Sequence, residues 1–212
     1  MKISVLQFPG TNCEYDTKYA FEQLGCVVEI IWHKEKTIPA DTDLLVIPGG
    51  FSYGDYLRSG AIARFANIME SVKEFASKGG KVLGICNGFQ ILLEAGLLPG
   101  AMKRNDTLHF ISKFHTLKVI NNDNTFLSLT KKDEVLNIPV AHHDGNYYID
   151  EKGLKELEDN NQILLKYCDK DGNLVNMNGS VSNIAGICNK EKNVFGLMPH
   201  PERAIEDILG ST

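Results

Sequence analysis

The segment Val82-Leu83-Gly84-Ile85-Cys86-Asn87-Gly88-Phe89-Gln90 decides the fold class of this 212-residue chain. Its apolar first half is typical of a buried strand, its second half begins a helix, and glycines lie two residues before and after the cysteine. This G-x-nucleophile-x-G pattern is typical of a sharp strand-to-helix turn that lifts a reactive side chain above a parallel sheet. A helix N-terminus also favours the thiolate. We therefore predict an α/β fold with Cys86 as a nucleophile, and an ordinary buried cysteine is the alternative.

The N-terminal half alternates between strands and helices, which favours a parallel sheet with right-handed crossovers. Strands are predicted at residues 3–8, 27–32, 44–47 and 82–85. One predicted helix has an apolar face made of Tyr15, Tyr19, Ala20 and Leu24, and the next has one made of Ile62, Phe65, Ala66, Met69, Val72 and Ala76. Because the carboxyl ends of parallel strands meet at one edge, Pro9-Gly10, Gly49-Gly50 and Cys86 are expected together there.

The C-terminal half lacks this alternation. Residues 107–120 and 139–149 look like antiparallel strands appended to the sheet. Further strands are predicted at residues 163–167, 184–187 and 194–198, and a short last helix is predicted to end at Leu209. Because there is no linker or internal repeat, residues 1–212 are predicted to form a single domain.

Composition narrows the classes of function. The chain has 43% hydrophobic and 23% charged residues, as in an ordinary globular protein, and a formal net charge of -5. This acidic balance argues against binding to nucleic acid or to an anionic membrane surface. No apolar run approaches the about 20 residues of a membrane-spanning helix. The five cysteines show neither CxxC spacing nor a cysteine–histidine cluster, so we predict no metal site, reduced thiols and a cytoplasmic location.

An acyl-transfer site at Cys86 needs donors for the developing oxyanion and a base. The turn itself supplies the Asn87 backbone N–H, and the pair Gly49-Gly50 is expected to supply another from the same edge of the sheet. His200 is the preferred base, because it follows a strand and is held extended by the next proline. Glu202, two residues later, would orient the imidazole as the third member of a triad.

Two groups compete with this assignment. The pair His142-His143, followed by Asp144, is an alternative base, a fragment of a metal site, or a loop that happens to contain histidines. Cys13 lies near the same predicted edge as Cys86 and is a weaker alternative thiol. The remaining cysteines lie in or beside apolar strands without such a turn and are expected to be structural: Cys26, Cys168 and Cys188.

The motif Gly84-x-Cys86-x-Gly88-x-Gln90 with the distant His200-Pro201-Glu202 resembles the class I (triad) glutamine amidotransferases. Four further stretches resemble those members of the family that are glutaminase subunits in purine biosynthesis. They are PGTNC at 9–13, GGFSYGDYLR at 49–58, NMNGS at 176–180 and MPHPER at 198–203. One departure concerns residues 141–145, which are AHHDG here and often AHGEG in the family.

The resemblance implies a flavodoxin-like, three-layer α/β/α fold with a mixed sheet and appended antiparallel strands. It implies that Cys86 attacks the glutamine amide to form a glutamyl thioester, which water then hydrolyses. His200 would transfer the proton, and Glu202 would orient the imidazole. The oxyanion-binding and substrate-binding residues that it implies are Gly49, Gly50, Asn87, Gln90, Gly179 and Ser180.

The same resemblance implies partners. No phosphate-binding loop of the type GxxxxGK[ST] is present, so no cofactor is predicted in this chain itself. A separate large synthetase subunit would bind ATP and Mg²⁺ and use the ammonia to convert formylglycinamide ribonucleotide to its amidine. A small third subunit is also implied. Residues 53–58 offer aromatic and charged side chains and are the predicted docking segment.

Two other functions share the α/β pattern. Stress-response or redox proteins with a cysteine at such a turn commonly have a histidine directly after it, where this chain has Asn87. A flavin-binding module of the flavodoxin type needs a phosphate loop after the first strand. The sequence PGTN at 9–12 lacks the glycine density of such a loop.

Overall fold

One nine-stranded sheet runs through the computed structural model, which describes residues 1–210. Its strand order is β2-β1-β3-β4-β11-β10-β9-β6-β7. The N-terminal half contributes β1 (Lys2–Gln7), β2 (Val27–Trp32), β3 (Leu44–Ile47) and β4 (Lys81–Ile85). The C-terminal half contributes β6 (Ile111–Val119), β7 (Val135–His142), β9 (Ile163–Cys168), β10 (Ile184–Cys188) and β11 (Val194–Leu197). Residues 211–212 of the predicted domain lie outside this description.

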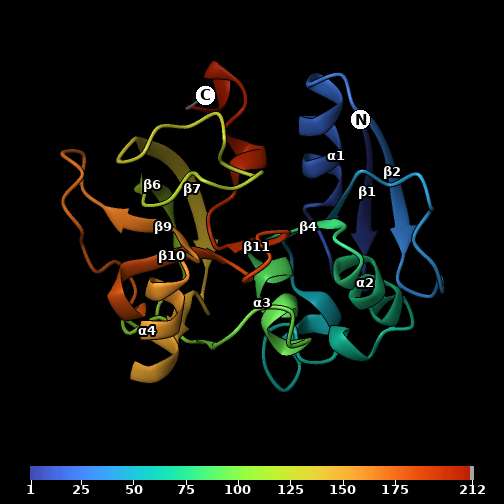
Figure 1. Cartoon of the computed structure of the whole chain (residues 1–212), viewed down its shortest axis with the longest axis horizontal. Helices are drawn as coiled ribbons and strands as arrows, with labels where there is room; N and C mark the ends of the chain where they lie inside the picture. Colours follow the sequence, from blue (N-terminus) through green and yellow to red (C-terminus); the bar gives the residue numbers. More distant parts are fainter. Residues whose placement is uncertain (211–212) are drawn as a thin grey trace.

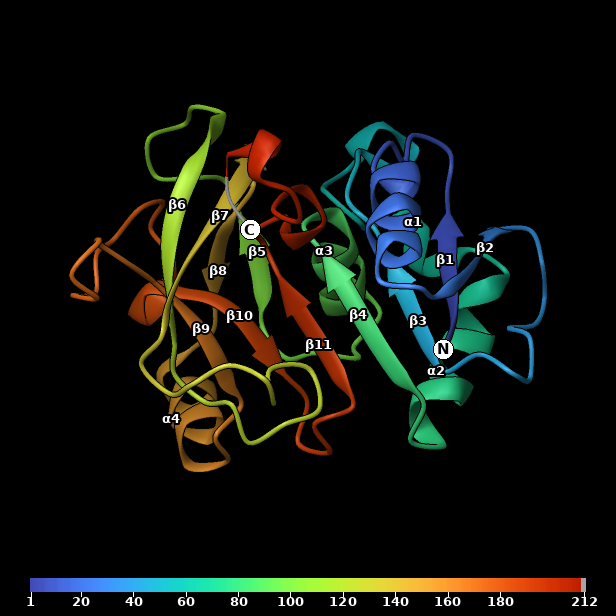
Figure 2. The ribbon, with the colours of Figure 1, turned by 90° about the horizontal axis from the view of Figure 1, so that it is seen from above.

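The half of the sheet formed by β2, β1, β3, β4 and β11 is parallel, as the alternation of strands and helices predicts. Its helices are α1 (Glu14–Gln23), α2 (Ile68–Ser77) and α3 (Asn87–Glu94). Figure 2 shows α1 in front of β1 and β3, whereas α2 and α3 lie behind the sheet. Because helices cover both faces, β3 is buried along its whole length. The predicted three-layer α/β/α arrangement is confirmed.

The other half is antiparallel, and β11 joins the two halves by pairing in parallel with β4 and antiparallel with β10. In Figure 1 the antiparallel strands lie to the left, the parallel half with α1 and α2 lies to the right, and α3 lies between them. The antiparallel strand expected within residues 107–120 is therefore confirmed as β6, and the further strands predicted at residues 163–167 and 184–187 correspond to β9 and β10.

Residues 139–149 do not form one continuous extended stretch. The backbone turns after His142, and β8 (Asn146–Tyr148) pairs with β5 (Ala101–Lys103) in a separate ladder. The turn is held at Gly145, whose N–H donates to Asn105 Oδ1 at 3.1 Å and whose carbonyl accepts from Asn178 Nδ2 at 2.7 Å. The apolar periodicity of the sequence predicted neither β5 nor the helix α4 (Glu151–Asp159), which begins after Asp150.

The predicted apolar face of the first helix is confirmed only at Ala20, which is buried. Tyr15, Tyr19 and Leu24 are exposed, and Thr17 lies beside Ala20 on the side of α1 that packs on the sheet. On the solvent side, Tyr19 donates its hydroxyl hydrogen to Glu206 at 2.9 Å.

The second predicted helix begins later than its apolar stripe suggests. Residues Ala63–Phe65 form a 3-10 turn, Ala66 is extended, and α2 starts at Ile68. Met69, Val72 and Ala76 are buried as predicted, but Phe65 is 72% exposed. The ring of Phe65 is covered instead by the Arg64 guanidinium, whose carbon lies 4.4 Å from the ring centroid.

Backbone-to-backbone contact fixes the turn between β4 and α3. A Cβ on Gly88 would overlap the carbonyl oxygen of Ile47 in β3. A Cβ on Gly84 would lie 2.8 Å from the backbone of Gly88. The glycines on either side of Cys86 are therefore required because α3 packs directly against the ends of β3 and β4.

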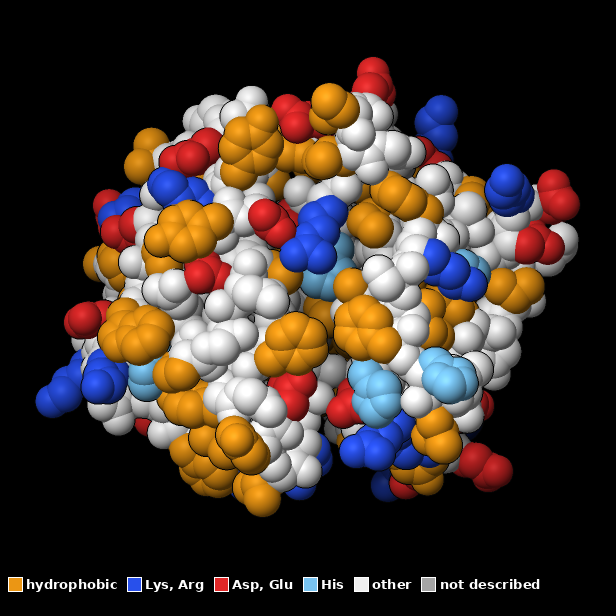
Figure 3. Space-filling model, turned by 180° about the vertical axis from the view of Figure 1, so that it is seen from behind, with side chains coloured by type: hydrophobic (Ala, Val, Ile, Leu, Met, Phe, Trp, Pro, Cys, Tyr) orange, Lys and Arg blue, Asp and Glu red, His pale blue; other side chains and the backbone are white. Residues whose placement is uncertain are grey.

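The surface is of mixed polarity. On the face shown in Figure 3, acidic and basic side chains are interspersed, and large hydrophobic side chains lie among them. Within residues 1–210, every helix is too short or too polar to cross a lipid bilayer.

Replacing Gly88 with alanine tests the contact with Ile47. Alanine is favoured over glycine in a helix by about 1 kcal/mol, so the change would stabilise α3 if there were room for a methyl group. Because there is none, we expect Gly88→Ala to lower the free energy of unfolding by about 3 kcal/mol in urea denaturation. Gly79→Ala is the control, since its Cβ would meet nothing within 4 Å and only its φ of +85° is unfavourable. A Gly88→Ala protein as stable as wild type would contradict the assigned contact.

Candidate active site

Cys86 occupies a strained turn. Its φ of 51° and ψ of -105° are unusual for a residue with a side chain, and such strain costs on the order of 1–3 kcal/mol. Cys86 N donates to Leu197 O of β11 at 2.8 Å, and Cys86 O accepts from Gln90 N of α3 at 3.2 Å. The Sγ lies 3.6 Å from the carbonyl oxygen of Ala141 in β7. The thiol is thus fixed at the first turn of α3.

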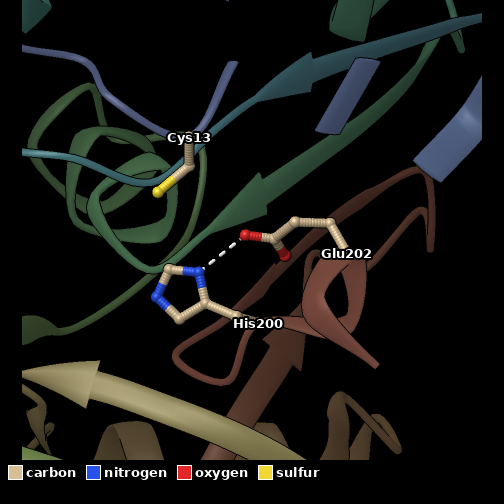
Figure 4. Close-up of side chains that lie close together, drawn as sticks. All are labelled: Cys13, His200 and Glu202. Atoms are coloured by element: carbon tan, nitrogen blue, oxygen red, sulfur yellow. Dashed lines mark hydrogen bonds and ion pairs between the residues drawn. The ribbon is translucent and has the colours of Figure 1, made fainter. Parts of the chain in front are cut away.

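His200 and Glu202 form a buried pair directly after β11. His200 Nδ1 donates to Glu202 Oε1 at 2.7 Å, because a carboxylate can only accept (Figure 4). His200 N donates to Pro139 O of β7 at 2.8 Å, which fixes the backbone that carries the ring. The structure therefore brings the predicted base and the predicted orienting carboxylate together.

Electrostatics couple this pair to the nucleophile. Burial is the largest single influence on the pKa of His200 and lowers it, but the negative charge of Cys86 and the hydrogen bonds at the ring together outweigh burial and raise that pKa well above its usual value. These hydrogen bonds are to Cys13, Cys86 and Glu202. The site consequently favours an imidazolium at His200, a proton donor for the group that leaves when a cysteine attacks a carbonyl.

The predicted oxyanion residues lie at the same edge of the sheet. Asn87 is the first residue of α3, and its side-chain Oδ1 accepts from Ser52 N at 3.0 Å, which ties the helix start to the loop after β3. Gly50 has a φ of +143°, and a Cβ there would lie 2.7 Å from Asn12 N. A Cβ on Gly49 would lie 2.8 Å from Cε1 of His200. Both glycines thus permit close approach of the loop to the site.

A cavity of about 200 Å³ opens beside the thiol. Its wall includes Gly50, Cys86 and Gln90, so three of the predicted site residues share it. Among the described residues, Gly179 and Ser180 are not part of this wall. Ser180 is buried and holds the turn after β7, donating to Gly145 O at 3.2 Å and accepting from Tyr147 N at 3.0 Å. The predicted contact of Gly179 and Ser180 with glutamine stays a prediction.

The competing histidine, His142, lies in the same wall but in another chemical state. Its Nδ1 is bonded to Asn105 Oδ1 at 3.1 Å rather than to a carboxylate. Burial first, and then the charge of His200, lower the pKa of His142 to about 4. His142 is therefore a neutral imidazole at physiological pH, and its environment does not resemble that of His200.

Cys13 lies closer to the site than its sequence position suggests. Ligand atoms of Cys13, His200 and Glu202 are all within 4.8 Å of one another (Figure 4). However, His200 Nδ1 and Glu202 Oε1 are bonded to each other, and Arg203 Nη2 donates to Cys13 Sγ at 3.1 Å. A guanidinium at the sulfur disfavours a cation in the same place, so we assign no metal to this cluster.

Comparison with known proteins decides the family. Residues 1–211 match the CobB/CobQ-like glutamine amidotransferase domain. The chain belongs to this glutamine amidotransferase family. The resemblance and the fold predicted from the sequence are thereby confirmed, and the stress-response, redox and flavin-binding alternatives are set aside. The roles of individual residues stay predictions.

Relatives within the family are close. The chain is 69% identical to phosphoribosylformylglycinamidine synthase subunit PurQ of Sulfurimonas denitrificans, over all of this chain and 94% of that protein. It is 63% identical to the same subunit of Wolinella succinogenes, over all of this chain and 94% of that protein.

Solved structures agree with this placement. The PurLQS structure from Thermotoga maritima is similar with a TM-score of 0.88 and 40% identity, over 99% of this chain and 92% of that one. A glutamine amidotransferase structure from Thermotoga maritima shares the fold, with a TM-score of 0.62. It is 15% identical over 95% of this chain and 76% of that one.

The neutral state of His142 predicts a loss of stability in acid. Its pKa is about 4 in the folded protein and about 6.5 when unfolded, so the unfolded state binds more protons between these pH values. Stability should fall as pH drops from 6.5 to 4, by up to about 3 kcal/mol from this group. We expect His142→Gln to remove that part of the fall in urea denaturation at pH 7 and pH 4. His200, Asp144 and His115 also face this group, so the comparison is between variant and wild type. Parallel pH dependences of the two proteins would contradict the assignment.

Proposed function

We propose that this glutamine amidotransferase is the glutaminase subunit of phosphoribosylformylglycinamidine synthase. In this proposal it hydrolyses glutamine to glutamate and ammonia, and a synthetase subunit uses the ammonia and ATP to convert formylglycinamide ribonucleotide to its amidine. The observation that carries the proposal is the buried His200–Glu202 pair coupled to a thiol held on a strained turn, in a chain 69% identical to a protein named as this subunit.

The geometry supports a two-step reaction. Cys86 Sγ, as the thiolate, attacks the amide carbon of glutamine, and the oxyanion accepts hydrogen bonds from the Asn87 and Gly50 backbone N–H groups. The His200 imidazolium gives its proton to the amide nitrogen, the C–N bond breaks, and ammonia leaves. Neutral His200 then takes a proton from water, which attacks the thioester carbon. Glutamate leaves, and the thiolate and imidazolium are restored.

Glu202 supports both steps without touching the reacting atoms. Its carboxylate accepts from His200 Nδ1, so the other ring nitrogen, Nε2, is left for proton transfer. The carboxylate also stabilises the imidazolium in each step at which it forms.

A partner is supported by the printed description of the similar Thermotoga maritima structure as PurLQS. Hydrophobic side chains lie exposed on the loop after β3: Phe51, Tyr56 and Leu57, which are 48%, 74% and 88% exposed. Phe51 also lines the cavity beside Cys86. We therefore place the docking surface for the synthetase on residues 51–57, next to the point at which ammonia is released. A small third subunit belongs to the same proposal.

Arg58, the last residue of the predicted docking segment, also forms an ion pair within the chain. Its Nε and Nη2 bond to the two carboxylate oxygens of Glu94 at 2.6 and 2.7 Å, so it ties the loop to α3. ATP and Mg²⁺ are assigned to the synthetase, because this chain has no GxxxxGK[ST] loop. All five cysteines are free, which supports a cytoplasmic location.

Labelling distinguishes the two thiols near His200. A chloroketone analogue of glutamine should alkylate Cys86 and spare Cys13, and Cys86→Ser should abolish glutamate release measured with the synthetase present. His200→Ala should lower kcat by about 10²–10⁴-fold, and Glu202→Gln by less, because that change leaves the imidazole in place. Alkylation of Cys13, with turnover surviving in Cys86→Ser, would refute the assignment.

The docking surface can be tested separately from the chemistry. Removing two exposed hydrophobic side chains with Tyr56→Ala and Leu57→Ala should weaken binding to the synthetase by about 10-fold or more, because such anchors commonly dominate interfaces. Leu129→Ala is the matched control, since Leu129 is 100% exposed and lies outside the loop. Both proteins should still be alkylated at Cys86 by the chloroketone. Equal affinity of the two variants for the synthetase, measured by sedimentation, would place the docking surface elsewhere.

A further inference from the structure

Two carboxylates in the wall of the cavity have no part in the chemistry at Cys86. Asp55 follows Gly50 in the loop after β3, and Asp144 lies in the turn after β7. Asp144 Oδ2 accepts from Ser59 Oγ at 2.9 Å, and Asp144 Oδ1 lies 2.9 Å from His143 Nδ1. Arg104, also in the wall, has its Nε 4.0 Å from Asp144 Oδ1.

These carboxylates form an environment that favours a cation. Burial, and then the negative charge of Asp144, raise the pKa of Asp55 to about 6, although hydrogen bonds to Ser59 and Asn87 act against the rise. No described ion pair includes Asp55. A positive group placed between the two carboxylates would relieve their repulsion and favour the ionised form of both.

Gln90 holds this arrangement through both polar atoms of its side chain. Its Nε2 donates to the backbone carbonyl of Asp144 at 2.6 Å, and its Oε1 accepts from Asn87 Nδ2 at 2.8 Å. Gln90 thus connects the start of α3 to the turn that carries Asp144. Its predicted contact with glutamine stays a prediction, and these two bonds give Gln90 a positioning role as well.

A second observation in the same wall points to a ligand. His142 is 2% exposed, and its Nε2 has no hydrogen-bond partner among the described residues. Asn105 donates from Nδ2 to the carbonyls of His109 and His142 at 2.9 Å, so its Oδ1 must accept. The proton of His142 is therefore on Nδ1, and Nε2 carries a lone pair. Such a lone pair can accept a hydrogen bond from the amide NH₂ of a bound molecule.

We propose that Asp144 and Asp55 bind the α-ammonium group of glutamine, with Arg104 facing its α-carboxylate. This inference rests on the proposed glutaminase function and adds how the substrate is selected and oriented. The amide then extends towards Cys86, past Ala141 and His142, whose backbone and ring offer acceptors. Glutaminase action on a molecule that has the amide but lacks the ammonium group should be poor for this reason.

The test compares two substrates in each variant. Glutaramate has the same amide and carboxylate as glutamine but lacks the α-ammonium group. In Asp144→Asn, the ratio of kcat/KM for glutamine to that for glutaramate should fall by about 10-fold or more, mainly through KM, because a charge-assisted bond is lost. Asp55→Asn should act in the same direction. Where turnover of glutaramate is too slow, protection of Cys86 from iodoacetamide gives the two affinities instead.

Structural damage would have a different signature. A change that only deforms the cavity lowers both kcat/KM values together and leaves their ratio unchanged, which would overturn the proposal. Asp159→Asn, in exposed α4, is the control for loss of a carboxylate elsewhere. Arg104→Gln is tested in the same way with 4-aminobutanamide, which keeps the ammonium and amide groups but lacks the carboxylate. Wild type that releases no glutamate from glutamine in the presence of the synthetase would instead refute the proposed function.

A pH series gives an independent measurement. Because ionised Asp55 attracts the ammonium group, the affinity for glutamine should increase as pH rises through about 6. The other charged groups that face this point are Asp144, Arg104 and His143. Asp55→Asn should remove the rise for glutamine, and glutaramate should not show it in wild type. A rise of equal size for both substrates would contradict the proposal.

Discussion

The strained turn at Cys86 is the constraint on which the site depends. A residue with a side chain is held at φ 51° because α3 contacts the backbone of β3 and β4 at Gly88 and Gly84. The strained conformation persists because the backbone of Cys86 is bonded on both sides, its N–H to β11 and its carbonyl to α3. This one turn sets the positions of the thiol, the Asn87 N–H and Gln90. The packing of α3 on the sheet and the geometry of the site therefore cannot vary independently.

The edge strand β7 brings the antiparallel half of the sheet into the site. Its carbonyl groups at Pro139 and Ala141 face away from β6 and contact His200 N and Cys86 Sγ. On an edge strand such carbonyl groups normally bond to solvent or are open to pairing with another chain. Here they hold the base and the nucleophile, so residues more than a hundred positions apart are fixed against one strand. The order of strands, in which β7 follows β6 at the end of the sheet, therefore has a direct chemical consequence.

The sequence predicted those features that depend on neighbouring residues. The parallel strands, the turn at Cys86 and the pair His200–Glu202 are each encoded within a few positions, and their apolar runs and glycines are explicit. The face of α1 was predicted wrongly except at Ala20, because small side chains, Thr17 and Ala20, pack on the sheet where the larger apolar ones were expected. The start of α2 was predicted too early, because Phe65 continues the apolar stripe of the sequence although its side chain is exposed.

The charged part of the cavity wall could not be predicted from the sequence, because it combines distant loops. Asp55, Arg104 and Asp144 come from three separate connections and meet only after the sheet has formed. In the sequence Asp55 lies within the stretch 49–58 and Asp144 within residues 141–145, which depart from the pattern common in the family, but neither stretch indicates that the two carboxylates meet.

Charge is divided between the two ends of the proposed substrate site. The end at Cys86 holds an imidazolium and stabilises developing negative charge, whereas the end at Asp55 and Asp144 favours a positive group. A glutamine bound in the reverse direction would move its ammonium group away from the acidic pair towards the His200 imidazolium and leave only the neutral amide at the acidic pair, so the attraction there would be lost. Burial keeps His142 neutral between these ends, so it adds no charge that would oppose the imidazolium. The same electrostatic arrangement therefore also selects the orientation in which the amide reaches the thiol.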